Sequence, residues 1–189
     1  MKQVIFIIIL TISINSFGQT AEEYFVRAIS KEKIRDYEGA ILDYSKAIEL
    51  EPNKANIYYN RGNVKHDIGD YSGAISDFTK AIELEPDFEG AFINRGVSKF
   101  FNGNFKDAII DYSSAILLNP YSKESYYLRG ISKQNIEDYS GSISDFTKAI
   151  ELDSNDQRAY YYRGYSKHLV GNHKEAIDDF NAGKFGHLN

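Results

Sequence analysis

The spacing of hydrophobic and polar positions in residues 58–82 predicts two helices that follow one another closely. The first pattern, at i, i+4, i+7 and i+10, consists of Tyr58, Gly62, Lys65 and Ile68. The second, at i, i+1, i+4, i+7 and i+8, consists of Ala74, Ile75, Phe78, Ala81 and Ile82. Gly69-Asp70-Tyr71 separates them, and glycine followed by aspartate is typical of one helix ending and the next beginning. The segment therefore predicts an antiparallel pair of helices.

Both patterns return every 34 residues, so the chain is a tandem array. The first helix repeats an Arg-Gly motif preceded by an aromatic residue, at Tyr58–Gly62, Phe92–Gly96, Tyr126–Gly130 and Tyr160–Gly164, with Tyr24–Ala28 one step earlier. The second helix repeats a small residue, Ile, Asp and an aromatic residue, starting at Ala40, Ala74, Ala108, Ser142 and Ala176. A fixed period of this length is typical of stacked units that bury their apolar faces only against their neighbours.

We expect five repeats, at residues 21–54, 55–88, 89–122, 123–156 and 157–189. Proline follows the second helix of the first three repeats and prevents its continuation, at Pro52, Pro86 and Pro120. The fifth repeat has a degenerate C-terminal end, because Gly183 and Gly186 replace alanine and leucine. Its second helix is expected to fray from about Gly183 and to leave Ile177, Phe180 and Phe185 open to weak self-association or partner docking.

These recurring aromatic, Gly, Lys, Gly-Asp-Tyr, Ala and Pro positions resemble the tetratricopeptide repeat family over residues 21 to about 185. The resemblance implies an all-α fold, a right-handed superhelix of five helix-turn-helix repeats. Three residues depart from the family pattern. Arg35 and Glu137 stand where glycine usually ends the first helix, and Ser154 replaces the proline of the fourth repeat.

Glycine recurs inside the first helices, at Gly62, Gly96, Gly130 and Gly164. Each such glycine is less favourable than alanine by about 1 kcal/mol in a helix interior. A fourfold recurrence therefore indicates that the missing side chain allows a close approach. We expect the paired helix at these points, where its nearest small residues are Ala74, Ala108, Ser142 and Ala176.

The N-terminal residues 1–18 have the composition of a secretory signal peptide. Lys2 precedes the apolar run Val4–Leu10, and Ser16-Phe17-Gly18 provides small residues before a cut after Gly18. An uncleaved anchor is the alternative, but the run is shorter than the about 18–20 residues of a spanning helix. We expect export to the periplasm or the extracellular space. Thr20 and Glu23 then form a capping box at the start of the first repeat.

Composition excludes several functions. A net charge of −5 without a basic block argues against nucleic acid or an anionic membrane as the ligand. The chain has no cysteine for disulfides, thiolate metal sites or nucleophilic catalysis. The four histidines form no HExxH motif, Asp153–Asp156 lacks the glycine and glutamate of a calcium loop, and Gly183-Lys184 is no phosphate loop. We expect no enzymatic activity, no cofactor and no metal.

The family resemblance implies that a protein or peptide partner lies against the concave surface formed by the first helices. The candidate groove residues are Tyr59, Asn60, Asn63, Asn94, Tyr127, Tyr161, Tyr162 and Tyr165. The alternative is that these aromatic residues only pack between repeats. Asn63 and Asn94 match the asparagines of the family's carboxylate clamp. Tyr59, Glu124 and Leu128 replace its cations, so we do not expect a clamp.

Two charged positions recur in every repeat, which indicates a structural ladder between helices rather than a ligand site. They are Arg27, Arg61, Arg95, Arg129 and Arg163, and Asp43, Asp77, Asp111, Asp145 and Asp179. The favoured function is an exported, non-enzymatic scaffold for a protein segment. The alternatives are an envelope assembly module that associates through its ends, with a weak homo-oligomer, and a groove for a small ligand or glycan.

Overall fold

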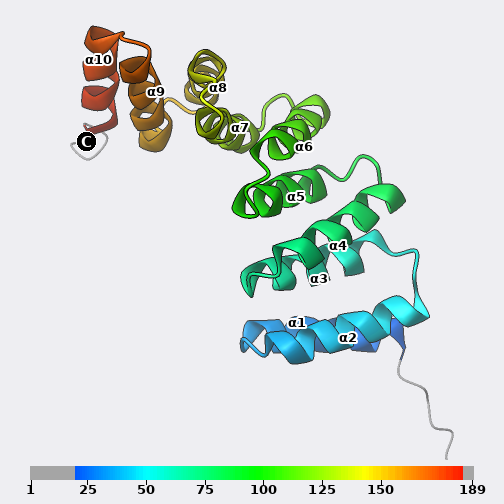
Figure 1. Ribbon diagram of the computed structural model, residues 1–189. Coiled ribbons are helices and arrows are strands. Elements are labelled where there is room, and N and C mark those ends of the chain that lie inside the picture. The colour runs from blue at the N-terminus through cyan, green and yellow to red at the C-terminus, as the bar shows by residue number, and fades with distance from the viewer. Residues whose placement is uncertain (1–19, 185–189) are drawn as a thin grey trace, which may run out of the picture.

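The computed structural model describes residues 20–184 as antiparallel helix pairs stacked along a curved path (Figure 1). The helices are α1 (Ala21–Lys33), α2 (Tyr37–Leu50), α3 (Ala55–Asp67), α4 (Tyr71–Leu84), α5 (Glu89–Phe101), α6 (Phe105–Leu118), α7 (Lys123–Asn135), α8 (Tyr139–Leu152), α9 (Gln157–Leu169) and α10 (His173–Lys184). Each odd-numbered helix packs against the even-numbered helix that follows, and each even-numbered helix contacts the next pair. The predicted all-α solenoid of helix pairs is therefore confirmed.

Two predictions concern the ends of the chain. The expected signal peptide, residues 1–18, lies outside the described residues. α10 extends to Lys184, so Gly183 is helical, and the expected fraying beyond it falls on residues that the structure does not describe. Within residues 20–184, no helix combines the length and the apolar character that crossing a membrane requires.

Side-chain caps fix where the helices begin. At α1 the expected capping box is present: the Glu23 amide donates to Thr20 Oγ1 at 3.1 Å, and the Thr20 amide donates to a Glu23 carboxylate oxygen at 3.2 Å. Asp70 caps α4 by accepting from the amide of Gly73 at 2.9 Å, and Asp36 and Asp138 do the same for α2 and α8. In these three pairs the aspartate after the turn thus starts the second helix, whereas Asn104 before α6 makes no side-chain cap bond.

Left-handed residues end the first helices of the pairs. Gly69, Gly103 and Gly171 have φ angles of 82°, 81° and 88°. Arg35 and Glu137, which depart from the family pattern at this point, adopt the same conformation with φ angles of 62° and 61°. A side chain in this region is strained by roughly 1–2 kcal/mol. The turn geometry is therefore kept even where glycine is missing.

The glycines inside the first helices make room for an aromatic ring of the paired helix. A Cβ on Gly62 would lie 2.8 Å from Phe78 Cε1, and a Cβ on Gly96 would lie 2.7 Å from Tyr112 Cε1. A Cβ on Gly130 would likewise lie 2.9 Å from Phe146 Cε1. The close approach was predicted correctly, but its predicted partner was wrong at these three positions, because the ring lies between the helices and not the small residue.

The arginine and aspartate positions form the expected structural ladder. Arg61 donates from Nε and Nη2 to the two carboxylate oxygens of Asp77, at 2.9 and 2.7 Å, and Lys65 pairs with the same carboxylate at 2.8 Å. Arg61 Nη1 also donates to Ser45 Oγ of the preceding repeat, at 2.9 Å. Arg95, Arg129 and Arg163 bond in the same way to Thr79, Ser113 and Thr147. The arginine therefore joins the two helices of its own pair and ties them to the pair before.

The aspartates of this ladder are buried, which changes the expected energetics. Asp111 is 1% exposed, and Asp77 and Asp145 are 3% exposed. A buried carboxylate needs its cationic partners far more than an exposed one does, because removing one partner leaves an uncompensated charge. Within residues 20–184, every buried side-chain nitrogen or oxygen has a hydrogen-bond partner. Removal of one cation from this ladder should therefore destabilise the chain more than removal of one from an exposed ion pair.

Candidate functional site

The odd-numbered helices lie on the inner side of the curved stack. Direct contacts join α3 to α5, α5 to α7 and α7 to α9, so within residues 20–184 these helices approach one another more closely than the even-numbered helices do. The eight candidate residues all lie on these helices and are all tyrosine or asparagine. We refer to this inner surface, formed by the odd-numbered helices, as the concave groove. Its candidate residues carry no formal charge.

Three candidate residues from two repeats form one hydrogen-bonded group, which we call the amide cluster: Tyr59, Asn63 and Asn94. Asn94 Nδ2 donates to the Tyr59 hydroxyl oxygen at 3.0 Å and to Asn63 Oδ1 at 2.8 Å. Both amide hydrogens of Asn94 are therefore used inside the cluster. This leaves Asn94 Oδ1 as an acceptor, beside the Asn63 amide and the Tyr59 hydroxyl as donors. The cluster thus presents donors and an acceptor side by side.

A depression of about 150 Å³ lies next to the amide cluster. Its lining residues are Asn63, His66, Asp67, Phe78, Asn94 and Val97. His66 Nδ1 lies 3.0 Å from Ser98 Oγ, and that hydroxyl donates to the Asn94 carbonyl. Because Ser98 has only one hydroxyl hydrogen, His66 is the donor in this bond and keeps Nε2 as an acceptor. Burial lowers the pKa of His66, which favours this neutral form.

The aromatic candidates Tyr59 and Tyr127 are half-buried and pack between repeats. The Tyr59 ring lies 4.7 Å from that of Phe88, the residue that precedes α5. Tyr127 lies 5.8 Å from Tyr162, and the guanidinium of Arg158 covers its ring at 4.8 Å. Burial raises the pKa of Tyr127 to about 12. Both rings are therefore held in place near the repeat junction, with Asn94 and Arg158 as their contacts in the next repeat, and show only part of their surface to the groove.

Two further tyrosines are open to solvent at the C-terminal end of the groove. Tyr161 is 56% exposed and Tyr165 is 45% exposed. Tyr161 contacts the Tyr162 ring edge-on at 5.4 Å, so the structure brings Tyr127, Tyr161 and Tyr162 into one aromatic group. This end of the groove offers large amphipathic side chains of the kind that anchor binding partners.

Two candidates, Asn60 and Tyr165, join neither group, and one contributor was missed. Asn60 donates its amide to the Asn56 carbonyl of its own helix at 2.7 Å. Arg158 stacks on Tyr127 but lies outside the positions that the repeat comparison selected. Arg158 follows Tyr127 by 31 residues and lies on a helix of the next repeat, so no local spacing in the sequence indicates this contact.

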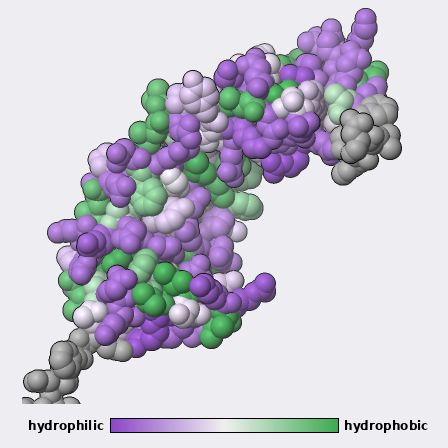
Figure 2. Space-filling view, turned by 180° about the vertical axis from the view of Figure 1, so that it is seen from behind, coloured by the Kyte–Doolittle hydropathy of each residue, from purple (hydrophilic) through white to green (hydrophobic). Residues whose placement is uncertain are grey.

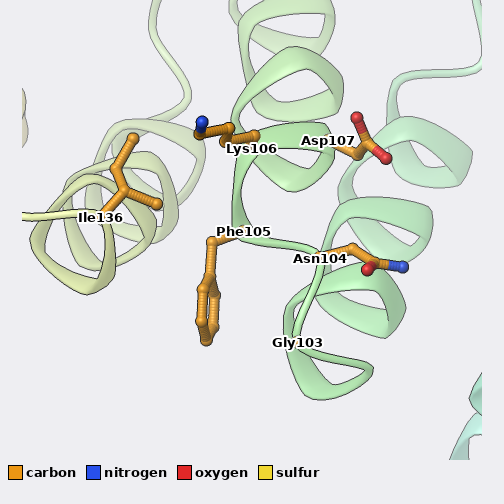
Figure 3. A pocket seen from close by; sticks show the side chains of 6 residues that line it. All are labelled: Gly103, Asn104, Phe105, Lys106, Asp107 and Ile136. Atoms are coloured by element: carbon orange, nitrogen blue, oxygen red, sulfur yellow. The ribbon is translucent and has the colours of Figure 1, made fainter.

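A second depression lies outside the concave groove, at the edge where α6 begins and α7 ends. It has a volume of about 410 Å³. Figure 3 shows Lys106 and Ile136 approaching it from facing sides, while Asn104 and Asp107 point away. Lys106 and Asp107 are exposed, so solvent screens their charges. This depression offers a ligand little polar recognition.

The outer side of the third repeat carries exposed apolar residues, which we call the outer patch: Ile110, Leu117, Leu118 and Tyr121, at 61%, 83%, 42% and 81% exposure. Three other repeats hold an ion pair at the positions of Ser114 and Leu117. These pairs are Lys46–Glu49, Lys80–Glu83 and Lys148–Glu151. Figure 2 shows apolar side chains in separate patches among polar ones on the face turned away in Figure 1. Substitutions in the outer patch therefore provide a control for substitutions in the concave groove.

No group of three or more histidine, cysteine, aspartate or glutamate side chains within residues 20–184 converges as a metal site would. The described part of the chain therefore offers a curved stack of helix pairs whose inner surface carries hydrogen-bonding and aromatic groups. This combination defines a helical-repeat scaffold for protein interaction.

The comparisons with known proteins identify the family. A "TPR repeat" family matches residues 36–69, and a "Tetratricopeptide repeat" family matches residues 55–88 and 127–185. Together these matches cover more than half of the chain, so it belongs to the tetratricopeptide repeat family. Proteins of this family are generally non-catalytic interaction modules. The comparison with the curated proteins found no match.

Solved structures with the same fold include several tetratricopeptide repeat proteins. A crystal structure of MamA is 25% identical, has a TM-score of 0.85, and is matched over 89% of this chain and 92% of that chain. MamA from Desulfovibrio magneticus RS-1 is 22% identical, has a TM-score of 0.83, and is matched over 88% of this chain and 94% of that chain. YrrB, described as "a TPR protein with an unusual peptide-binding site", is 24% identical, has a TM-score of 0.78, and is matched over 89% of this chain and 87% of that chain.

Proposed function

We propose that the chain is an exported, non-enzymatic scaffold that holds an extended segment of a partner protein in its concave groove. The family and the fold support an interaction scaffold. The amide cluster supports the groove as its binding surface, and it is the observation that carries the proposal. Export rests on the residues of the N-terminal segment.

The amide cluster matches the chemistry of a peptide backbone. An extended peptide presents N–H donors and C=O acceptors alternately, and each is satisfied by a group of the opposite kind. Asn94 Oδ1 can accept from a peptide N–H, while Asn63 Nδ2 can donate to a peptide carbonyl. The mutual bonds hold these side chains in one orientation, which reduces the entropy lost when a partner binds.

The charge of the groove favours an uncharged partner segment. The eight candidate residues are tyrosine and asparagine, and the cations of a carboxylate clamp are replaced by Tyr59, Glu124 and Leu128. Recognition therefore relies on amide bonds and on aromatic contacts at Tyr161 and Tyr165. Such binding depends only weakly on salt, in contrast to an interaction between opposite charges. The description of YrrB as peptide-binding supports a peptide ligand for this fold.

The proposal is tested by selecting ligands from a random peptide library displayed on phage and measuring their affinity for three forms of the chain. Asn94→Ala with Asn63→Ala removes the amide cluster, and Ser114→Lys with Leu117→Glu alters only the outer patch. We expect the first variant to bind roughly tenfold or more weakly, since interface hot spots typically contribute about 2 kcal/mol or more. The second should bind like the wild type.

The opposite ranking would place recognition on the outer side of the solenoid. Tyr161→Ala with Tyr165→Ala extends the test to the C-terminal end of the groove. The Asn60→Ala variant is a matched control within the groove, because Asn60 bonds only to its own helix among the described residues. Circular dichroism confirms that each variant keeps its helices.

Export is tested separately. The Lys2 and Val4–Leu10 pattern supports a cleaved signal peptide, with a mature chain that begins at Gln19. Intact-mass measurement of protein from a periplasmic or culture fraction should give this chain. A full-length species that retains Met1 in that fraction would contradict cleavage.

A second candidate function is an assembly module that associates through its C-terminal end. Ile177 is 59% exposed on α10, and Tyr161 and Tyr165 are exposed on α9, the helix paired with it. These side chains could pack against a second chain. Analytical ultracentrifugation over a range of concentrations distinguishes this module from the groove scaffold, because only the module predicts a dimer that Ile177→Lys disrupts.

A further inference from the structure

The turn between α9 and α10 brings two histidines face to face. His168 lies in the last turn of α9, and His173 is the first residue of α10. Their Nδ1 atoms are 3.1 Å apart, and their ring centroids are 4.8 Å apart. Both side chains are exposed, so a dissolved ion can reach them.

The second repeat shows what is particular to this pair. The equivalent positions there hold His66 and Tyr71, whose ring centroids are 5.2 Å apart. A tyrosine at this position offers no nitrogen to a metal, and His66 instead turns its Nδ1 to Ser98 of the next repeat. In the remaining repeats the position of His173 is also aromatic, at Tyr37, Phe105 and Tyr139. Histidine at 173 therefore converts a packing contact into a pair of imidazoles.

The distance between the two nitrogens fits a bridging cation. Each neutral imidazole has one lone pair, and two lone pairs at this separation repel unless a proton or a metal ion lies between them. Zinc binds imidazole nitrogen at about 2.0–2.1 Å, so two such bonds spanning 3.1 Å would meet at an angle of roughly 98°. This angle lies between the values for octahedral and tetrahedral coordination.

We propose that His168 and His173 form a two-histidine site for a divalent transition metal ion, of which Zn²⁺, Cu²⁺ and Ni²⁺ are the candidates. These ions prefer imidazole ligands, whereas Mg²⁺ and Ca²⁺ prefer oxygen. No third histidine, cysteine or acidic side chain within residues 20–184 joins the pair, so water or a donor from another molecule completes the coordination. The bound ion links the end of α9 to the beginning of α10.

This proposal departs from the expectation of no metal site. That expectation rested on the HExxH motif and on the spacing of acidic residues, both of which describe sites within one helix or one loop. The pair forms across a turn between two helices, with four residues between the histidines. Sequence spacing alone does not show that their nitrogens converge.

The test is a calorimetric titration of the full chain, after removal of any affinity tag, with zinc chloride and nickel chloride. We expect one equivalent of metal to bind. His173→Tyr restores the residue of three other repeats at this position, so the variant should fold like them. It should bind the metal roughly tenfold or more weakly, because even loss of an outer partner of a ligand costs that much. His66→Gln is the matched control and should bind like the wild type.

The histidine ring signals in a long-range ¹H–¹⁵N spectrum give an independent readout. Zinc should shift the signals of His168 and His173 and leave those of His66 in place, while magnesium should shift none of them. His168→Gln provides a second variant should His173→Tyr lose its helices. Unchanged zinc affinity in both variants, or no binding at millimolar zinc, would overturn the site.

Discussion

Gly96 on α5 faces the ring of Tyr112 on α6, and a Cβ at Gly96 would lie 2.7 Å from Tyr112 Cε1. The Tyr112 side chain is almost fully buried, at 1% exposure. The ring therefore cannot move outward to admit a methyl group without separating the two helices. The absence of a side chain at one position sets the distance between the helices of a repeat.

The Gly96→Ala variant tests this contact directly. Alanine favours a helix over glycine by about 1 kcal/mol, yet we expect a net loss of stability because overpacking typically costs about 1–3 kcal/mol. Gly96→Leu should disrupt the array more severely. Urea unfolding followed by circular dichroism measures both. Replacing Tyr112 with leucine in the Gly96→Ala background should recover part of the loss, and a more stable Gly96→Ala single variant would contradict the contact.

The arginine ladder predicts unequal effects of the same substitution at two positions. Arg95 has 16% of its side chain exposed, pairs with buried Asp111 and bonds to Thr79 of the preceding repeat. Arg27 pairs with Asp43 but is 40% exposed. Arg95→Met should lower the free energy of unfolding by about 3 kcal/mol, at the low end for a broken buried pair because Lys99 still contacts Asp111.

Arg27→Met should cost no more than about 1 kcal/mol, as is usual for partly exposed pairs. Thermal and urea unfolding of the two variants give the comparison. Both aspartates are buried, so equal losses would show that exposure of the arginine does not control the energetics of the ladder.

Asp43 predicts a loss of stability in acid. The hydrogen bond from Arg27, together with Lys31, holds the pKa of Asp43 at about 2, below its usual value of about 3.9. A pKa that is lower in the folded chain stabilises the fold above the unfolded value, and this contribution disappears as the pH falls from about 4 toward 2. Urea midpoints measured across this window should fall for the wild type. The urea midpoint should fall less steeply with decreasing pH for Asp43→Asn than for the wild type. Identical slopes would exclude Asp43 as a source of the loss of stability in acid.

Glu137 predicts a stabilising substitution. Its φ of 61° lies in the left-handed region, where glycine fits without strain and other residues are unfavourable by roughly 1–2 kcal/mol. Glu137→Gly should therefore raise the stability by up to about 1 kcal/mol, after the greater flexibility of unfolded glycine is included. Gly103→Ala, at a φ of 81°, is the reverse change and should destabilise. A melting temperature that falls in Glu137→Gly would contradict the strain.

The fold could be predicted from the sequence because each repeat confirms the others. Gly69, Asp70 and Pro86 each mark the end or the start of a helix by their own backbone preferences. Because the pattern has a period of 34 residues, helix boundaries assigned in one repeat can be assigned in all five. The partner of Gly96 could not be predicted in this way. The period shows that the position is crowded, but it offers both Ala108 and Tyr112 of the paired helix as the neighbour. Only the three-dimensional packing shows that the ring of Tyr112 lies there.

The candidate site was predictable only in part, because equivalent positions meet different neighbours. Tyr127 and Tyr161 occupy the same position in successive repeats, yet Tyr127 is half-buried beneath Arg158 and Tyr161 is 56% exposed. Asn60 and Asn63 lie three residues apart on one helix, but only Asn63 reaches Asn94. The exposure and the hydrogen bonds of these side chains depend on the residues of the next repeat. A comparison of equivalent positions among the repeats does not show these differences.

A bond to a hydroxyl of the preceding repeat also governs how this scaffold can change its length, and it is made by Arg61, Arg95, Arg129 and Arg163. Arg61 and Ser45 are separated by 16 residues, as are Arg95 and Thr79. A duplication or deletion of 34 residues keeps that separation at the new junction, and the bond is kept wherever one of the first four repeats precedes it, because these repeats supply the serine or threonine. Unequal recombination within the coding sequence can therefore yield longer or shorter solenoids that need no compensating mutation at the new junction between repeats. An insertion of another length inside a helix, between an arginine and its partner, changes this separation of 16 residues and should destabilise the fold.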